Sequence, residues 1–182
     1  MSRLFHDFYV QPMYQVYIET IAIYLIWTIA MLLLRGKVRR IVTIVGTALA
    51  FVLILSYTVL FRSSEGTQEL SLIPLISFLN AKKEPELYRT MYMNMLLFMP
   101  LGLSLPFAIS DKSQHNILIT VLVGILFSIT IEVCQYVFSL GRCETDDVIM
   151  NTIGVLVGIT SYLLSRIILR LAVGAKVKTL NR

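Results

Sequence analysis

Five apolar segments, each long enough to cross a lipid bilayer, constrain this chain more than any other feature of its sequence. A transmembrane helix needs about 20 predominantly apolar residues to cross roughly 30 Å of hydrocarbon. The 182 residues are 57% hydrophobic and only 15% charged, whereas soluble domains are about 25% charged. The sequence therefore predicts an all-α, polytopic integral membrane protein built as one domain. The predicted spans are Tyr17–Leu34, Ile41–Phe61, Tyr92–Ile109, Ile117–Phe138 and Val148–Leu169.

The loop between the first two spans predicts the orientation of the protein. Residues 35–40 carry four positive charges and no acidic residue. The positive-inside rule places such a loop in the cytoplasm. The N-terminus is then outside, and the basic tail over residues 172–182 is cytoplasmic. In this setting the net charge of +5 reflects the loops of a membrane protein, and we expect the lipid bilayer, and no nucleic acid, as a partner.

The long outer segment between the second and third spans contains a further apolar stretch. Residues 69–80 are mostly apolar, are interrupted by Pro74, and are too short to cross the membrane. They predict an interfacial or re-entrant piece over the outer ends of the helices, and an amphipathic surface helix is the alternative.

Few polar residues lie inside the predicted spans, and each of them needs a partner or water. Glu132 is the informative one, because it lies about 9 Å inside its span at 1.5 Å per residue. Ser128 and Gln135 share its helix face at i, i+4 and i+7 spacing. In the third span, Asn94 and Phe98 lie one turn apart, and Pro100 removes a backbone donor.

The last span presents a second mixed face. Asp147, Asn151, Gly154 and Gly158 follow i, i+4, i+7 and i+11 spacing. The two glycines allow another helix to approach closely, and the same face permits self-association into a homo-oligomer. The preceding loop contributes Arg142 and Asp146, which we expect at the same outer depth.

Each polar residue also has a purely structural interpretation. Asp146 can cap the last span, and Asn94 and Asn151 can form interhelical hydrogen bonds. Glu132 can be held by an ion pair with Arg142 or by a hydrogen bond to either asparagine. Arg62, after the second span, is expected to be a solvated helix end. Cys134 and Cys143 are treated as ordinary residues.

The spacing of these residues resembles the VanZ-like family of small bacterial membrane proteins over about residues 50–165. The similar elements are Asn94-x-x-x-Phe98-x-Pro100-Leu-Gly102, Glu132-x-x-Gln135 and Gly141-Arg142-x-x-x-Asp146-Asp147-x-x-x-Asn151-x-x-Gly154-x-x-x-Gly158. Arg62 and the Pro74 segment also look like family features. Membership implies a multi-pass protein of the bacterial cell membrane, with Asn94, Glu132, Gln135, Arg142, Asp146, Asp147 and Asn151 as motif positions.

The resemblance also implies a function at the outer face. The founding member of the family accompanies glycopeptide-resistance clusters and lowers susceptibility to teicoplanin, a lipid-tailed antibiotic that acts on cell-wall precursors. We therefore expect a non-enzymatic resistance or cell-envelope factor whose outward polar pocket meets a lipid-linked cell-wall precursor or a lipoglycopeptide. We expect neither a cofactor nor a metal.

Two other functions stay open. One is a membrane enzyme acting on a polyprenyl phosphate or phospholipid, with Glu132 as the best candidate for a catalytic group. Its usual sequence motifs are missing, because neither histidine fits a phosphatase or zincin spacing and no Gly-x-Ser-x-Gly elbow is present. The other is a transporter or flippase component, which the interrupted third span favours and the small size disfavours.

Overall fold

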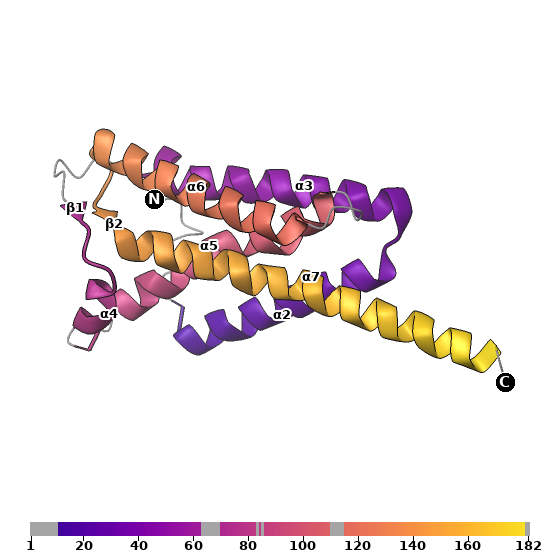
Figure 1. Cartoon of the computed structure of the whole chain (residues 1–182). Coiled ribbons are helices and arrows are strands. Elements are labelled where there is room, and N and C mark those ends of the chain that lie inside the picture. The colour runs from indigo at the N-terminus through magenta and orange to yellow at the C-terminus, as the bar shows by residue number, and fades with distance from the viewer. Residues whose placement is uncertain (1–10, 63–69, 83, 85, 110–114, 181–182) are drawn as a thin grey trace.

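The chain forms one bundle of long helices, and helices that follow one another in the chain run in opposite directions (Figure 1). The computed structural model describes residues 11–62, 70–82, 84, 86–109 and 115–180, with side chains described as far as residue 172. Five of the described helices are long and apolar enough to cross a membrane. They are α2 (Met13–Leu33), α3 (Gly36–Leu55) with its π-helical continuation η1 (Ser56–Leu60), α5 (Glu86–Ala108), α6 (Asn116–Val137) and α7 (Thr145–Leu180).

The five predicted spans are confirmed, but several of the helices are longer than the apolar runs. α5 begins at Glu86 rather than at Tyr92, and α7 continues to Leu180. α5 also runs unbroken through Pro100 and Pro106. The carbonyl groups of the two prolines also accept side-chain hydrogen bonds: Ser104 Oγ donates to Pro100 O at 2.7 Å, and Asn116 Nδ2 donates to Pro106 O at 3.1 Å. Hydropathy marks the stretch that meets lipid, whereas the backbone helix extends beyond it.

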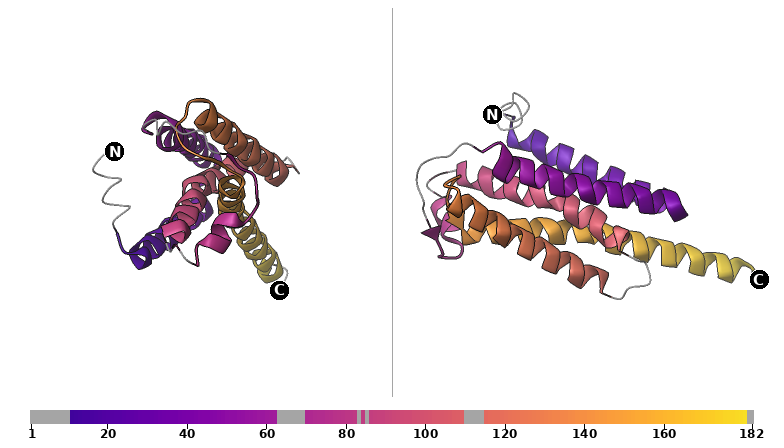
Figure 2. Two further views of the ribbon diagram at one scale, coloured as in Figure 1. Left: turned by 90° about the vertical axis from the view of Figure 1, so that its left-hand side faces the viewer. Right: turned by 90° about the horizontal axis from the view of Figure 1, so that it is seen from above.

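α5 and α7 form the most extensive helix pair and the centre of the bundle (Figure 2). Their backbones touch, because a Cβ on Gly154 would lie 2.0 Å from Met95 O and a Cβ on Gly158 would lie 2.4 Å from Met99 O. Phe98 is fully buried beside this contact in one hydrophobic cluster with Leu101 and Val155.

α2 lies at the periphery and exposes most of its apolar side chains. Ile18, Ile26 and Leu33 are 63%, 68% and 74% exposed. Two hydrogen bonds of 2.8 Å join it to α7, one between Tyr24 Oη and Thr160 Oγ1 and one between Thr28 Oγ1 and Ser161 Oγ. Exposed aliphatic surface of this extent fits contact with lipid chains.

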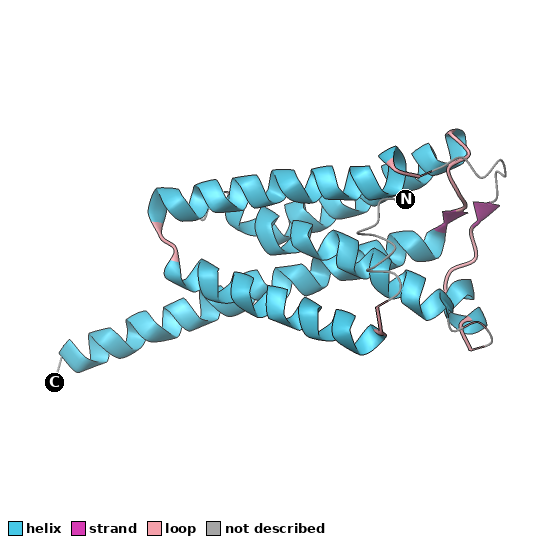
Figure 3. Ribbon diagram, turned by 180° about the vertical axis from the view of Figure 1, so that it is seen from behind, coloured by secondary structure: helices cyan, strands magenta, loops and turns pink. Residues whose placement is uncertain are grey.

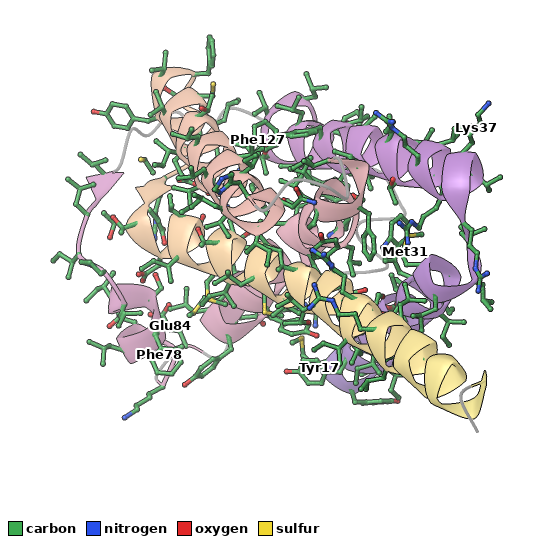
Figure 4. All side chains as sticks on the ribbon, turned by 45° about the vertical axis from the view of Figure 1, so that its right-hand side comes forward. Tyr17, Met31, Lys37, Phe78, Glu84 and Phe127 are labelled. Carbon is green, nitrogen blue, oxygen red and sulfur yellow. The ribbon has the colours of Figure 1, made fainter. Side chains whose placement is uncertain are left out.

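The two ends of the bundle differ in structure and in charge. One end carries α4 (Ile76–Asn80) and two short strands, β1 (Leu70–Ser71) and β2 (Cys143–Glu144), which pair in parallel with Leu70 opposite Cys143. We call this the α4 end (Figures 1 and 3). The opposite end contains the start of α3, where Lys37 points away from the bundle (Figure 4), and the second half of α7. We call it the basic end, because Arg35, Lys37, Arg39, Arg40, Arg166 and Arg170 lie there.

Candidate functional site

Asp146 joins the segment that carries α4, residues 70–80, to the helix bundle. Its side chain is 3% exposed, and its two carboxylate oxygens accept hydrogen bonds from the backbone N–H groups of Leu75 and Ser77. Leu75 has a φ of 62°, a conformation that costs an L-residue roughly 1 kcal/mol. The buried carboxylate therefore holds a strained turn in place. Sequence reasoning considered Asp146 as a cap for its own helix, but the helix that it caps is α4, which lies about 70 residues earlier in the chain.

Asp147 points to a different helix from Asp146. Its Oδ1 accepts a hydrogen bond of 2.6 Å from Asn94 Nδ2 and thereby joins α7 to α5. The two neighbouring carboxylates at the start of α7 therefore bind different elements: Asp146 binds the turn at α4, and Asp147 binds α5. The bond to Asp147 is the interhelical hydrogen bond that the sequence suggested for Asn94, and its acceptor is a carboxylate.

Glu132 is buried, and its Oε2 accepts a hydrogen bond of 3.0 Å from the backbone N–H of Glu144 in β2. None of the partners considered from the sequence was a backbone amide. Glu144 itself accepts from Ser77 Oγ at 3.2 Å and pairs with Arg142 Nη1 at 3.4 Å. Glu144 is thus the ion-pair partner seen for Arg142, and it links β2 to α4.

Two buried amides lie on the same side of the bundle. Gln135 Nε2 donates to Thr58 O in η1 at 3.0 Å, and Asn151 Nδ2 donates to Ser128 Oγ at 2.9 Å. The acceptor for Gln135 belongs to the π-helical turn η1, and such turns are frequent at functional sites. Within the described part of the chain, Gln135 Oε1 and Asn151 Oδ1 are buried acceptors with no hydrogen-bond partner.

Arg62 belongs to the site, which sequence reasoning did not expect. A Cβ on Gly141 would lie 2.8 Å from Arg62 Nη2, so the guanidinium packs directly on the Gly141 backbone. Its charge acts on both Glu132 and Asp147. Ser77 and Glu144 were missed as site members as well. The Pro74 interruption was the available signal for Ser77, because a broken apolar segment must return to the bundle through hydrogen-bonded turns.

The remaining predicted residues have structural positions. Phe98 and the backbones of Gly154 and Gly158 lie in the α5–α7 core, and Pro100 lies within α5. The glycine face considered for self-association is therefore covered by α5 within the same chain.

The acidic residues at the α4 end do not converge on one point. In the described ranges, no group of three or more His, Cys, Asp or Glu side chains has an arrangement that could hold a metal ion. Asp146, Asp147 and Glu132 instead accept from separate amide donors, and Glu144 accepts from the Ser77 hydroxyl and pairs with Arg142. The arrangement can bind and orient polar groups at the end of the bundle, where strands, α4 and helix ends meet.

Cys143 in β2 reports the charge of this site. Burial raises the pKa of its thiol, and the carboxylates of Glu132, Asp147 and Glu144 raise it further. Because only the thiolate reacts, a water-soluble alkylating reagent should modify Cys143 of a Cys134→Ser variant at pH 8 several-fold more slowly than it modifies glutathione. Raising the pH should restore the rate, and adding Glu144→Gln should increase it. Equal rates for Cys143 and glutathione at pH 8 would contradict this prediction.

Comparison with known families identifies the chain. The model of the VanZ/LLP1 family matches residues 22–168, from the third turn of α2 to well into α7. Neither the comparison with curated proteins nor that with solved structures yields a match. The matched region is most of the chain and includes every residue of the site described above. With five apolar helices joined through this site, the chain belongs to the VanZ/LLP1 family of membrane proteins.

Proposed function

We propose that this protein is a non-enzymatic factor of the bacterial cell envelope. It binds a lipid-tailed amphiphile at the extracytoplasmic face and lowers susceptibility to lipoglycopeptides of the teicoplanin type. One observation carries the proposal: the α4 end combines an exposed apolar surface with a buried polar cluster, and Asp146 and Glu144 join the two.

The apolar part of this end is the outer segment itself. Six large apolar side chains on it are between 47% and 66% exposed. Side chains this exposed add little to the packing of the bundle, and an exposed apolar patch is typical of contact with lipid or an apolar ligand. The six are Leu70, Leu72, Ile73, Leu75, Phe78 and Leu79.

The polar part offers groups that suit a charged or sugar-bearing head. Arg142 is 54% exposed, and its planar guanidinium matches a phosphate or carboxylate in a bidentate manner. The buried oxygens of Gln135 and Asn151 can accept hydrogen bonds from hydroxyl or amide donors. An amphiphile with an acyl or prenyl tail and a polar head therefore finds complementary surfaces side by side.

The side of the membrane follows from the charge distribution. The basic residues 35–40, which the sequence predicted as a loop, mostly form the first turn of α3, and they lie at the opposite end of the bundle from α4. If these residues are cytoplasmic, as the positive-inside rule predicts, the α4 end faces outward. Lipid-linked cell-wall precursors and teicoplanin act there, which supports the link to the founding member of the family.

Expression in a teicoplanin-susceptible bacterium tests the proposal. We expect the wild type to raise the minimum inhibitory concentration of teicoplanin several-fold and to leave that of vancomycin, which has no lipid tail, nearly unchanged. Glu132→Gln should lose most of this protection, because a neutral amide weakens the bond to Glu144 N–H and alters the charge balance with Arg62.

The matched control is Glu84→Gln, which removes an exposed carboxylate at the same end (Figure 4). It should protect as the wild type does. Immunoblots of membrane fractions establish equal expression of all variants. Unchanged teicoplanin susceptibility on expression of the wild type would overturn the proposal, and equal protection by Glu132→Gln would remove Glu132 from it.

The position of Arg62 favours a second candidate, a membrane enzyme for polyprenyl phosphates or phospholipids. A cation acting on two carboxylates, the buried Glu132 and the half-buried Asp147, is an arrangement that can bind phosphate and move a proton. Purified protein incubated with polyprenyl phosphate, polyprenyl pyrophosphate and phospholipid across divalent metals decides this. Product that disappears in Asp147→Asn would establish the enzyme, and its absence under all conditions would exclude it.

A further inference from the structure

A second polar site lies at the basic end, on the opposite side of the bundle from the residues of the α4 end. The structure has a pocket of about 240 Å³ there, formed mainly by the second half of α7 with contributions from α3 and α5. Three arginines line it, namely Arg39, Arg166 and Arg170. Phe107 and Leu169 supply apolar walls.

Ser165 is the observation that points to a ligand. Its side chain is 1% exposed and lines the pocket, and its Oγ has no hydrogen-bond partner among the described residues. A buried hydroxyl without a partner costs about 1–3 kcal/mol. In a helix, serine hydroxyls ordinarily bond back to the carbonyl four residues earlier, as Thr20, Thr28 and Ser104 do in this chain. The hydroxyl hydrogen of Ser165 is therefore available to a ligand in the pocket.

Arg166 is held in a defined position beside this hydroxyl. Its Nη1 donates to Tyr162 Oη at 2.9 Å, and its guanidinium carbon lies 5.5 Å from the centre of the Tyr162 ring. Tyr162 is fully buried, and its Oη also accepts from Asn116 Nδ2 at 3.2 Å. Because a guanidinium group has five N–H donors, the Arg166 side chain, bound to Tyr162 through Nη1, still offers donors to a ligand.

No described acidic residue pairs with Arg166 or Arg170 in this pocket. No described Asp or Glu lies in the second half of α5, in the first half of α6 or in the second half of α7. Asp111, which the sequence assigns to this end, lies outside the described residues. The charges of Arg166 and Arg170 therefore favour an anion.

From these contacts we propose that the pocket binds the phosphate of an anionic phospholipid in the adjoining leaflet. The non-ester oxygens of the phosphate diester accept from Arg166 and Arg39, and Ser165 Oγ donates to the same group. Phe107 and Leu169 contact the glycerol and the first carbons of the chains. Ile168 and Leu171, on the same stretch of α7, are exposed toward lipid, so that the tails continue into the bilayer. This site is independent of the function proposed for the α4 end.

The lipid preference of the purified full-length protein tests the inference. Native mass spectrometry after exchange into phosphatidylglycerol or phosphatidylcholine micelles should show retained phosphatidylglycerol, about tenfold more than phosphatidylcholine. Arg39→Gln should reduce the retained phosphatidylglycerol about tenfold, the effect of losing a charge-assisted hydrogen bond. Ser165→Ala should reduce it about threefold.

Arg40→Gln is the matched control, because it removes the same charge from the next residue of α3, which is exposed and does not line the pocket. It should retain phosphatidylglycerol as the wild type does. Equal losses in Arg39→Gln and Arg40→Gln, or equal retention of the two lipids by the wild type, would overturn the inference.

A free phosphate ion could bind the same arginines and serine as the phosphate of a lipid, so inorganic phosphate is tested separately. We expect 10 mM phosphate to leave the thermal unfolding midpoint of lipid-depleted protein unchanged, and phosphatidylglycerol to raise it. A rise with phosphate alone that Ser165→Ala abolishes would overturn the lipid as the ligand and establish a soluble phosphate site. The wild-type comparison of headgroups needs no variant, so it decides the question even where a substitution prevents folding.

Discussion

Replacement of Gly154 by alanine is expected to destabilise the bundle by about 3 kcal/mol or more, because the new Cβ would lie 2.0 Å from Met95 O. The atom that it meets is backbone, so no side-chain rotation relieves the clash. α5 and α7 must instead move apart, and this opens the cluster around Phe98. Thermal unfolding in detergent, together with the yield of monodisperse protein, measures the effect.

Gly36→Ala is the control for adding a methyl group. A Cβ at Gly36 meets nothing within 4 Å, although φ is 55°, so only about 1 kcal/mol of backbone strain is expected. Gly102→Ala should resemble Gly154→Ala, because its Cβ would lie 2.1 Å from Val155 O on the opposite side of the same contact. A Gly154→Ala protein as stable as the Gly36→Ala protein would show that α5 and α7 are not packed backbone to backbone.

Replacement of Asp146 by alanine is expected to release the outer segment and to cost about 2–4 kcal/mol, since two N–H groups lose their acceptor. Leu75 then has nothing to hold its left-handed conformation. Hydrogen–deuterium exchange at the amides of Leu75 and Ser77 should rise by at least about tenfold, which corresponds to 1.4 kcal/mol of lost protection.

Asp147→Ala separates this effect from a general loss of charge. It removes the neighbouring carboxylate, whose partner is Asn94 on α5, so exchange at Leu75 and Ser77 should stay as in the wild type. Equal protection of these amides in Asp146→Ala and in the wild type would contradict the anchoring role. The sequence alone did not rank these two aspartates, and this pair of variants does.

The helical framework was predictable because lipid imposes a simple rule. Every backbone polar group must be satisfied within the segment that crosses the bilayer, so a span appears as a long apolar run. The five spans follow from this rule. Helix ends follow it less well, because a helix can continue beyond its apolar run. α5 begins at Glu86 and runs unbroken through Pro100 and Pro106.

The site was predictable in part, and periodicity is the reason. Ser128, Glu132 and Gln135 had to share one face of a helix, because side chains at i, i+4 and i+7 lie above one another. Arg62 had no such signal. It follows a span end, and only the turn at Gly141 shows that its guanidinium packs against the loop before α7.

The sequence by itself determined the membrane class, the number of spans, their faces and the concentration of acidic residues toward one end, because these follow from hydropathy and helical periodicity. Only the tertiary structure decided which groups meet: Asp146 with the α4 turn, Glu132 with the amide of Glu144, and Ser165 with a pocket of arginines. Such contacts join segments distant in the chain, and hydrogen-bonding geometry sets them within fractions of an ångström. No local pattern contains that information.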